Sequence, residues 1–579
     1  MVLNDKTAVV KALRDLSLYL QLQGENSFKT RAYDIAAERI AGLGEDIGEL
    51  VASGGLTALP GIGASIAAKI TELVTTGTMG TLEELKAKYP PKVLELLEVP
   101  ELGPKKVKTL VEQLQVGTLD QLEAACKDGR VRALKGFGEK TEGKLLEGIA
   151  LARRSKAGGR KRLADVLPTA EALLQVVKAA PGVQRAALGG SVRRRRETVA
   201  DVDLIASAKD AAPVFKALTS HPQVSQVIAD GASKASVRLK DGDLQVDLRV
   251  LPDEDFATAL HHFTGSKAHH IRLRGLAQDK GLKISEWGVH RGEEKLPIRE
   301  EDEIYELLGL QPVPPELRED TGEFEAAAKR ALPTDLVALA DIKGNVHAHS
   351  TWSDGQHTLE QMAAAGLMLG LEYLTVTEHS ETAGYANGLD ADRLKRQADE
   401  IDALNEKMQG RLVLLKGIET DILEDGSLDY PDAVLEKLDV VIGSIHTRHS
   451  QDEAAMTRRV LNAMENPHLM IWGHPTGRLL LKRDPAPMRI EVLLDKAAEK
   501  GIAVEVNGGP ERLDLKADHV RLALERGVKL TASTDAHSVG ELERNLPLAV
   551  STARKGWARR GDVLNTLSLG DFRRALRRR

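Results

Sequence analysis

The chain has 579 residues, of which 80 are Lys or Arg and 86 are Asp or Glu, so its formal net charge is −6. This length accommodates about three to five domains of ~100–200 residues, and the single cysteine, Cys126, excludes an intramolecular disulfide and fits a reducing compartment. The sequence shows no signal peptide and no apolar run long enough to span a bilayer, so we expect a cytoplasmic protein without membrane contact.

The first 150 residues contain one short pattern three times. A glycine turn precedes a lysine-bearing helical segment at LPGIG (59–63), VPELG (99–103) and LKGFG (134–138). A glycine turn that opens a helix presents backbone N–H groups and the positive end of the helix dipole to a phosphate. One such turn is usually an ordinary helix connection, but three in series predict a region that binds a DNA backbone without reading its sequence. The glycines expected to contact DNA are Gly61, Gly63, Gly103, Gly136 and Gly138.

Three segments are strongly basic. The stretch RRSKAGGRKR (153–162) follows the third glycine turn and also predicts a domain boundary. Four consecutive arginines occupy positions 193–196, and the chain ends in RRALRRR. A basic chain end is usually only a solvated tail, but together the three segments indicate contacts with phosphate backbones.

A carboxylate pattern appears in the middle third, in GGSVRRRRETVADVDLI (189–205). Asp201 and Asp203 are two residues apart in a strand-like apolar run, so their carboxylates share one face. Asp247 lies in LQVDLRV, a second predicted strand that can pair beside the first. An Asp-x-Asp alone is more often a turn or a solvated face, but the GGS turn upstream and the third Asp favour a nucleotidyltransferase.

The chemistry of such a site follows from its ligands. Three carboxylates that hold two Mg²⁺ or Mn²⁺ ions would activate a primer 3′-hydroxyl and stabilise the leaving pyrophosphate. Gly190 and Ser191 allow a triphosphate to approach the backbone closely, and Arg194 can bind its charge.

The last third concentrates histidines at the ends of short apolar runs. Ten of the 16 histidines lie between His347 and His537, and runs such as YLTVTE, VVIGSI and MIWG end at one of them. Short Val/Ile/Leu-rich runs that alternate with helical stretches predict a parallel βα array, whose reactive side chains collect at the carboxyl ends of the strands. The candidate ligands there are His347, His349, Asp354, His379, Glu419, His446, His474, Asp535 and His537.

Nine nitrogen and oxygen ligands without a cysteine suit two or three Zn²⁺, Mn²⁺ or Fe²⁺ ions. Clustered ions of this kind favour hydrolysis of phosphoesters. Any single histidine is as often an ordinary core or surface residue, but nine residues in order at strand ends predict a metallohydrolase. Four histidines lack that placement and are interpreted as ordinary: His357, His449, His468 and His519.

The amino-terminal and middle stretches resemble the family X DNA polymerases of the beta type, from about residue 5 to 320. The resemblance rests on NSFKTRAYDIAAERI (26–40), the GGS and Asp motifs, HFTGSKAHHIRLRGLAQDKGLKISEWGV (262–289) and EIYELLGLQPVPPELRE (303–319). It implies that Asp201, Asp203 and Asp247 ligate the metals and that Ser191 and Arg194 meet the triphosphate. It further implies a sugar and base site formed by Phe263, Gly265 and His270.

Some positions depart from that family or extend it. His262 stands where the family has a tyrosine beside the sugar 2′ position, which leaves the strength of ribose exclusion open. His270 stands near an expected asparagine, so its contact with the base edge should be altered rather than lost. Lys69, with Tyr33 as a neighbour, matches a lysine that forms a Schiff base with a deoxyribose 5′-phosphate. Phosphate binding is the better interpretation of Lys69, because the sequence shows nothing that would lower its pKa.

The last third resembles the polymerase-and-histidinol-phosphatase (PHP) domain. The motifs that carry this resemblance are, in order, GNVHAHSTWSDG, TEHS, KGIETDI, GSIH, GHP and STDAH. The resemblance implies a distorted (βα)7 barrel with a trinuclear metal site. All nine candidate ligands match the ligand positions of that family, which argues against a purely structural domain.

We therefore predict a multidomain α/β protein. Its parts are an all-α helix-hairpin-helix DNA-binding domain that includes the fingers (1–152), a beta-type nucleotidyltransferase palm with nucleotide selection and thumb (163–318), and a PHP barrel (335–570). The predicted function is a monomeric, nucleoid-associated repair polymerase that fills short gaps in double-stranded DNA with dNTPs. Its barrel would trim 3′ ends or cut at abasic sites. The alternatives are a barrel that only docks partners or braces the polymerase, or a small-molecule phosphatase.

Overall fold

The computed structural model of this chain describes residues 6–41, 47–59, 61–90, 92–99, 102–139, 141–146, 148–149, 160–240, 243–449 and 451–576. Outside the described residues lie parts of four sequence features: Pro60, residues 100–101, residues 153–159 of the basic linker and tail residues 577–579. The chain divides into two compact units, residues 1–159 and 160–579. None of the described helices combines the length and the apolar character needed to cross a membrane.

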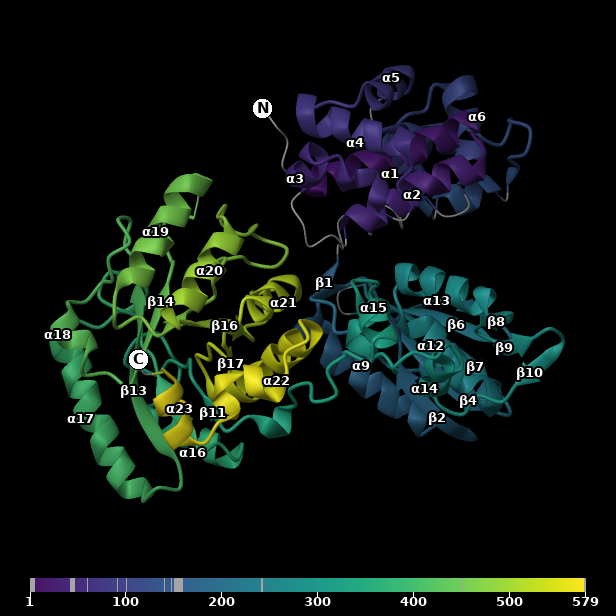
Figure 1. The fold of residues 1–579 in the computed structure, drawn as a ribbon. Helices are drawn as coiled ribbons and strands as arrows, with labels where there is room; N and C mark the ends of the chain where they lie inside the picture. The colour runs from purple at the N-terminus through teal and green to yellow at the C-terminus, as the bar shows by residue number, and fades with distance from the viewer. Residues whose placement is uncertain are drawn as a thin grey trace. The chain divides into compact units, whose positions relative to one another are not determined.

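The first unit is helical, as predicted (Figure 1). Helix α4 shows why: Ile66, Ile70 and Val74 recur every four residues and are all buried, so one face of the helix enters the core. The helices of this unit include α1 (Lys6–Gln23), α2 (Ser27–Ala41), α3 (Ile47–Ala52), η1 (Gly55–Ala58), α4 (Ala64–Thr76), α5 (Gly80–Lys88), η2 (Val93–Glu98), α6 (Pro104–Leu114) and α7 (Leu119–Lys127), and residues 141–146 and 148–149 are also helical.

The second unit begins with a five-stranded mixed sheet in the order β2-β4-β7-β6-β5, the predicted palm. The central strands β4 and β7 run parallel, and each pairs with an antiparallel neighbour on its other side. Apolar residues on both central strands are almost completely buried, which is typical of strands covered on both faces. The strands are β2 (Val183–Leu188), β4 (Asp201–Ala208), β5 (Val224–Asp230), β6 (Lys234–Leu239) and β7 (Gln245–Leu251).

Helices and a small sheet complete this polymerase-like part. Helix α9 (Leu163–Lys178) packs on the large sheet, and β8, β9 and β10 form a separate antiparallel sheet. The further elements are β1 (Lys161–Arg162), α10 (Gly190–Arg193), β3 (Thr198–Val199), α11 (Ala212–Thr219), η3 (Asp253–Asp255), α12 (Phe256–Thr264), α13 (Lys267–Asp279), β8 (Leu282–Ser285), β9 (Gly288–Arg291), β10 (Glu294–Leu296), α14 (Glu301–Leu307), η4 (Pro315–Leu317) and α15 (Glu323–Ala328).

The rest of the second unit is a seven-stranded parallel barrel whose strands follow one another in chain order. The ends of the first and last strands meet, since His349 N donates to Ala536 O at 2.8 Å. The predicted barrel fold is therefore confirmed. The strands are β11 (Gly344–Asn345), β12 (Tyr373–Val376), β13 (Val413–Asp421), β14 (Val440–Ser444), β15 (Ile471–Trp472), β16 (Ala503–Asn507) and β17 (Leu530–Ser533).

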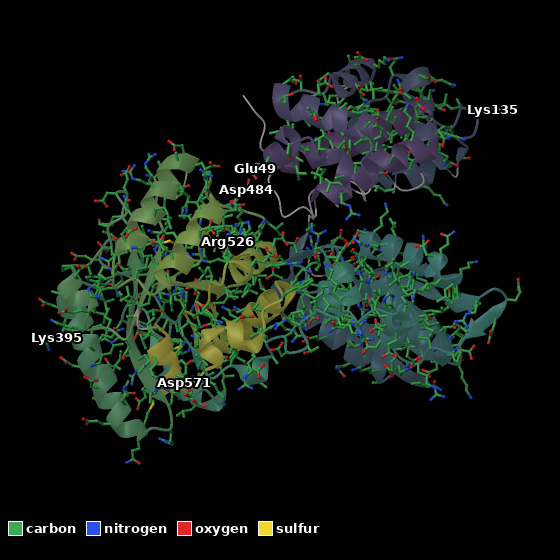
Figure 2. The ribbon with its side chains drawn as sticks, in the orientation of Figure 1. Glu49, Lys135, Lys395, Asp484, Arg526 and Asp571 are labelled. Carbon is green, nitrogen blue, oxygen red and sulfur yellow. The ribbon has the colours of Figure 1, made fainter. Side chains whose placement is uncertain are left out.

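Helices surround these strands (Figure 1), and Lys395 lies at the outer edge of the barrel (Figure 2). The helices and 3₁₀ turns are η5 (Leu339–Asp341), α16 (Leu359–Met368), η6 (Gly384–Ala386), α17 (Ala391–Met408), α18 (Asp432–Leu435), α19 (Glu453–Glu465), α20 (Ile490–Lys500), α21 (Ala517–Glu525), α22 (Val539–Lys555), η7 (Arg560–Asp562), η8 (Leu564–Thr566) and α23 (Leu569–Leu576).

The polymerase-like part and the barrel share an interface within the second unit. Leu513 and Leu548 of the barrel belong to the same apolar cluster as the palm sheet and α9. Arg478 of the barrel, almost completely buried, forms two hydrogen bonds with Glu197, at 3.1 and 2.6 Å. Buried guanidinium–carboxylate pairs of this kind fix geometry, because separating them leaves a charge without its partner.

Candidate active sites

Three carboxylates meet on the two central strands of the palm sheet. Asp201 and Asp203 lie on β4, and Asp247 lies on β7 directly opposite Asp203 in the parallel pairing. Burial, together with the charges of the other two carboxylates, raises the pKa of Asp203 to about 7. Burial and the charge of Asp247 also raise the pKa of Asp201. Neighbouring carboxylates that raise one another's pKa form a suitable site for a divalent cation, because its positive charge would stabilise their ionised forms.

A lysine that sequence reasoning missed contacts this cluster. Lys234 Nζ donates to Asp247 Oδ2 at 2.8 Å, and Gln245 Nε2 donates to Asp247 Oδ1 at 3.1 Å. Burial acts to raise the pKa of Asp247, but the hydrogen bonds from Lys234 and Ser236 outweigh it and lower this pKa. The sequence signal was the strand KASVRL, because Lys234 and Ser236 are two residues apart and therefore share one face of β6, which pairs with β7.

The predicted glycine turn lies directly against these carboxylates. Gly190 has a φ of +58°, and a Cβ placed on it would lie 2.1 Å from Asp203 Oδ2. Only glycine fits here, because a side chain would occupy the position of that oxygen and the backbone angle is costly for other residues. Gly190 opens the short helix α10, which also contains Ser191.

Arg194, expected to face the triphosphate, is held by two acceptors. Its Nε donates to Glu319 Oε1 at 3.1 Å, and its Nη1 donates to the carbonyl oxygen of Thr264 at 2.6 Å. The neighbouring Arg193 binds Thr264 Oγ1 and Glu301. These hydrogen bonds connect the C-terminal end of α12 to the glycine turn.

The predicted sugar and base contacts lie around the end of α12. The guanidinium of Arg249 lies 4.1 Å from the ring centroid of Phe263. A Cβ on Gly265 would lie 2.8 Å from His270 Nε2, and the rings of His262 and His270 are 5.0 Å apart. Burial lowers the pKa of His270 to about 3. This imidazole is therefore neutral near pH 7 and offers one N–H donor.

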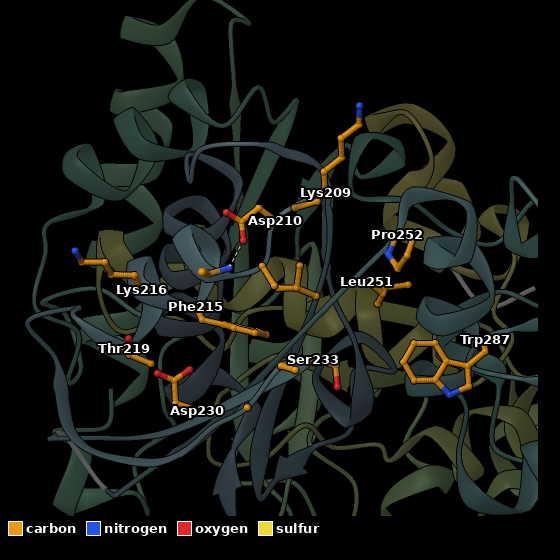
Figure 3. A pocket seen from close by; sticks show the side chains of 16 residues that line it. Lys209, Asp210, Phe215, Lys216, Thr219, Asp230, Ser233, Leu251, Pro252 and Trp287 are labelled. Carbon is orange, nitrogen blue, oxygen red and sulfur yellow. Dashed lines mark hydrogen bonds between the residues drawn. The ribbon is translucent and has the colours of Figure 1, made fainter.

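A pocket of about 700 Å³ lies at the other end of the palm strands (Figure 3). Lys209, Phe215 and Trp287 are among its lining residues. Asp201 begins β4, whereas the pocket follows Ala208 at the end of that strand. The pocket is therefore separate from the carboxylate cluster.

The helix-hairpin-helix glycines take the positions that the sequence predicts. Gly63 and Gly103 are the N-cap residues of α4 and α6. Gly61 and Gly136 have φ angles of +89° and +88°, which favour glycine, and Gly138 O accepts from Glu142 N at 2.9 Å. Lys69 is half-buried on α4, whereas Tyr33 is only 5% exposed. Contact with DNA and a lyase role for Lys69 stay predictions.

The barrel brings the nine predicted ligands together at the carboxyl ends of its strands. Glu419, on β13, is buried, and histidines contact both of its carboxylate oxygens. Its Oε1 lies 2.7 Å from His474 Nε2 and 3.2 Å from His446 Nε2. Its Oε2 lies 3.0 Å from His379 Nδ1 and 3.5 Å from His347 Nε2. A carboxylate in this position can bridge metal ions.

Eight of the nine predicted ligands fall into three groups, in each of which the ligand atoms lie within 4.8 Å of one another, and the ninth, His474, contacts Glu419 outside these groups. The groups are His349, Asp354, His379 and His537; His347, His349 and Asp535; and His379, Glu419 and His446. Several of these atoms, including His347 Nε2, His446 Nε2 and Glu419 Oε2, are buried without a hydrogen-bond partner in the described part of the chain. Buried polar atoms normally have hydrogen-bond partners. Ligand atoms that lie close together without such partners are therefore suited to coordinate a metal ion.

Two carboxylates behind the ligands were missed by sequence reasoning. Glu505 Oε1, on β16, lies 2.6 Å from His347 Nδ1, and Asp421 Oδ1, on β13, lies 2.7 Å from His446 Nδ1. Each leaves the Nε2 atom of its imidazole directed at the cluster, the usual way in which a carboxylate orients a histidine ligand. Asp421 could have been found from its two-residue spacing to Glu419, but Glu505 lies in a run, IAVEVN, without a histidine.

The rim of the barrel cluster carries an arginine and an aromatic residue. Arg512 Nε lies 3.4 Å from Asp535 Oδ2. Tyr385, in η6, is 70% exposed, and its ring centroid lies 6.4 Å from that of His379. A cation and an exposed ring beside a candidate metal cluster suit a phosphate and a nucleobase.

Four segments match known families. The matches are the DNA polymerase beta thumb (259–319), a helix-hairpin-helix domain (4–79), a SAM-like helix-hairpin-helix tandem (93–150) and the PHP domain (345–508). The chain is 39% identical over 576 residues to the DNA polymerase/3′-5′ exonuclease PolX of Bacillus subtilis (strain 168), covering 99% of each chain. It is 32% identical over 219 residues to a probable phosphatase of Thermoanaerobacter sp. (strain X514), covering 35% of this chain and 83% of the relative.

Proposed function

The chain belongs to the family X DNA polymerases that carry a PHP domain, and on this premise we propose that its two clusters divide DNA synthesis and hydrolysis. It is a DNA polymerase and a metal-dependent 3′–5′ exonuclease. The observation that carries the division is the presence of two chemically different clusters, three aspartates on the palm sheet and a histidine-rich set in the barrel. The aspartates suit Mg²⁺ or Mn²⁺, and the histidine-rich set suits Zn²⁺, Mn²⁺ or Fe²⁺.

Synthesis is assigned to the palm. Divalent cations bound by Asp201, Asp203 and Asp247 would supply charge neutralisation of the triphosphate and activation of the primer 3′-hydroxyl. Gly190 and Ser191 place backbone N–H groups beside the incoming phosphates, and Arg194 binds their charge. Three further residues complete the nucleotide site, with Phe263 and Gly265 against the sugar and the neutral His270 donating to the base edge.

Hydrolysis is assigned to the barrel. Metal ions held by the nine ligands would supply a nucleophile from water and stabilise the leaving 3′ oxygen. Glu505 and Asp421 hold His347 and His446 in the orientation that such ligation requires. Arg512 binds the scissile phosphate at the rim. The same chemistry extends to cleavage at abasic sites, the second activity proposed for the barrel.

The proposed substrate is gapped double-stranded DNA. The glycine turns of the first unit bind the phosphates beside the gap, and the palm adds dNTPs to its 3′ end. A small-molecule phosphatase is the second candidate for the barrel alone, favoured by the probable phosphatases that match over 35% and 33% of this chain. The fusion to a polymerase and its DNA-binding glycine turns supports a nucleic-acid substrate instead.

A duplex with a single-nucleotide gap and a 5′ phosphate tests this proposal in Mn²⁺. With dNTPs the primer should lengthen by one nucleotide, and without dNTPs it should shorten from its 3′ end. Unlabelled DNA should compete with hydrolysis of a phosphomonoester if both occupy the barrel. A primer that never shortens, together with phosphomonoester turnover insensitive to DNA, would favour the phosphatase.

Gly190→Ala should lower primer extension by about 100-fold or more, because the new methyl group displaces the Asp203 carboxylate and the backbone is strained by roughly 1–3 kcal/mol. Primer shortening should not change. Gly189→Ala is the milder comparison in the same turn and should lower extension much less, since a Cβ there would lie 3.2 Å from Phe263 O and 3.4 Å from Asp203 Cβ, without entering the position of the Asp203 carboxylate oxygen. Equal losses in both variants would show that the turn does not contact Asp203 specifically.

Glu505→Ala should raise the Mn²⁺ concentration for half-maximal primer shortening by about 10–100-fold, because His347 loses the carboxylate that orients it. Glu505→Gln keeps an acceptor oxygen and should show a smaller rise. Primer extension at saturating Mn²⁺ is the internal control and should remain unchanged. An unaltered Mn²⁺ requirement in folded Glu505→Ala would remove this positioning role.

A further inference from the structure

A lysine of the barrel, Lys555, contacts the polymerase-like part of the chain. Lys555 is the last residue of α22, and its side chain is only 10% exposed. Its Nζ donates to the carbonyl oxygens of Arg194, at 3.2 Å, and Glu316, at 3.0 Å, and to Glu319 Oε1, at 2.8 Å. All three acceptors belong to the polymerase-like part of the chain.

Glu319 connects this lysine to the arginine assigned to the triphosphate. The same oxygen, Oε1, accepts from Arg194 Nε at 3.1 Å and lies 3.7 Å from Arg196 Nη1. The side chains of Glu319 and Arg194 are each only 13% exposed. A buried carboxylate must be compensated by nearby cations, so the charge of Glu319 is shared between Lys555 and Arg194.

The two cations that share Glu319 determine how much positive charge Arg194 keeps for a triphosphate. A guanidinium has five N–H donors in a fixed plane, and the structure commits Nε of Arg194 to Glu319 and Nη1 to Thr264 O. Without Lys555, Glu319 would draw its compensation mainly from Arg194 and Arg196. The positive charge that Arg194 presents to a triphosphate would then be largely cancelled.

We propose that Lys555, a barrel residue, is a positioning residue for nucleotide binding, because it shares Glu319 and so leaves Arg194 the charge that the triphosphate needs. The inference rests on the triphosphate role of Arg194 proposed above. It makes the barrel part of the polymerase site, independently of hydrolysis in the barrel.

The neighbouring residue provides a matched control. Arg554 lies one position before Lys555 on α22 and crosses the same interface, with its Nε 3.0 Å from Glu316 Oε1. Its other recorded acceptors are carbonyl oxygens of residues 336 and 337. Loss of Arg554 therefore removes an ion pair from the interface without touching the Glu319–Arg194 pair.

The test measures kcat and KM for the dNTP on the gapped duplex, using full-length protein and a primer with a phosphorothioate terminal linkage that resists shortening. We expect Lys555→Met to raise KM by about tenfold with kcat within about twofold, since a shared charged hydrogen bond is lost. Arg554→Met should leave both constants within about twofold. Lys555→Met/Glu319→Gln should return KM to within about threefold of the original, because the uncompensated charge is gone.

Three results would overturn the inference: an unchanged KM in folded Lys555→Met, equal effects of Lys555→Met and Arg554→Met, or a double variant no better than Lys555→Met. If Lys555→Met does not melt cooperatively, Lys555→Gln, which keeps a donor but lacks the charge, takes its place with the same expectations. Arg194→Met separates this inference from its premise. An unchanged KM in Arg194→Met would remove the proposed triphosphate role, whereas a raised KM there with none in Lys555→Met would remove only the role of Lys555.

Discussion

Asp247→Ala should lower primer extension on the gapped duplex by about 1000-fold or more, the largest effect expected in the palm. The substitution removes one of three neighbouring carboxylates on β4 and β7, and it also frees Lys234, whose ammonium lies 2.8 Å from Asp247 Oδ2. A free cation beside Asp201 and Asp203 competes with a divalent metal for the remaining charge. Single-turnover extension with one dNTP measures the loss directly.

Asp253→Asn is the matched control for that variant. Asp253 follows β7 at the far end of the sheet, where it binds Arg185 at 2.8 Å and Ser207 at 2.6 Å. Its replacement removes a partly exposed ion pair and should change extension by less than about threefold. Primer shortening should persist in both variants. Substantial extension by folded Asp247→Ala would show that the palm cluster does not perform the transfer.

Glu419→Gln should lower primer shortening by more than about 100-fold, beyond the 10–100-fold typical when a supporting partner of a ligand is lost. The amide keeps the volume of the side chain but loses the negative charge that four imidazoles surround at 2.7–3.5 Å. It also replaces one oxygen by an N–H donor, which cannot ligate a metal. Loss of metal from the purified variant, measured by elemental analysis, should accompany the loss of activity.

The control for this variant lies five residues along the chain. Glu424 is 59% exposed and pairs with Arg448 at 2.9 Å, outside the cluster. Glu424→Gln should therefore retain shortening and metal content. Extension should be normal in Glu419→Gln, because Glu419 contacts only barrel residues among its recorded partners. A Glu419→Gln variant that still shortens primers would place the exonuclease elsewhere.

The residues that sequence reasoning located are those governed by short-range geometry. Asp201 and Asp203 share a face because strand side chains alternate, and Asp247 joins them because its strand pairs in parallel with theirs. The candidate ligands of the barrel were expected to lie together because a parallel barrel gathers the residues that follow its strands at one end, and the structure places them together. Both inferences follow from the regular geometry of strands and barrels rather than from one particular side-chain contact.

The residues that were missed depend on contacts that no local pattern encodes. Glu505 is buried in the middle of a strand and is recognisable only once His347, 158 residues away, is placed beside it. Lys555 and Glu319 are 236 residues apart, and each alone reads as an ordinary surface charge. Arg194 was expected to face a phosphate, and the structure adds the acidic partner that limits its charge. Such pairs follow from how two parts of a fold pack, which depends on the whole chain.

The apolar cluster shared by palm and barrel limits which deletions and substitutions in the barrel the polymerase can tolerate during evolution. A deletion of the barrel would strip Leu513 and Leu548 from the palm core and leave Glu197 and Glu319 without their partners Arg478 and Lys555. A point substitution at a single barrel ligand removes hydrolysis without that structural loss. We therefore expect lineages that dispense with the nuclease to keep the barrel and lose its ligands one by one, and comparison of their genes will test this.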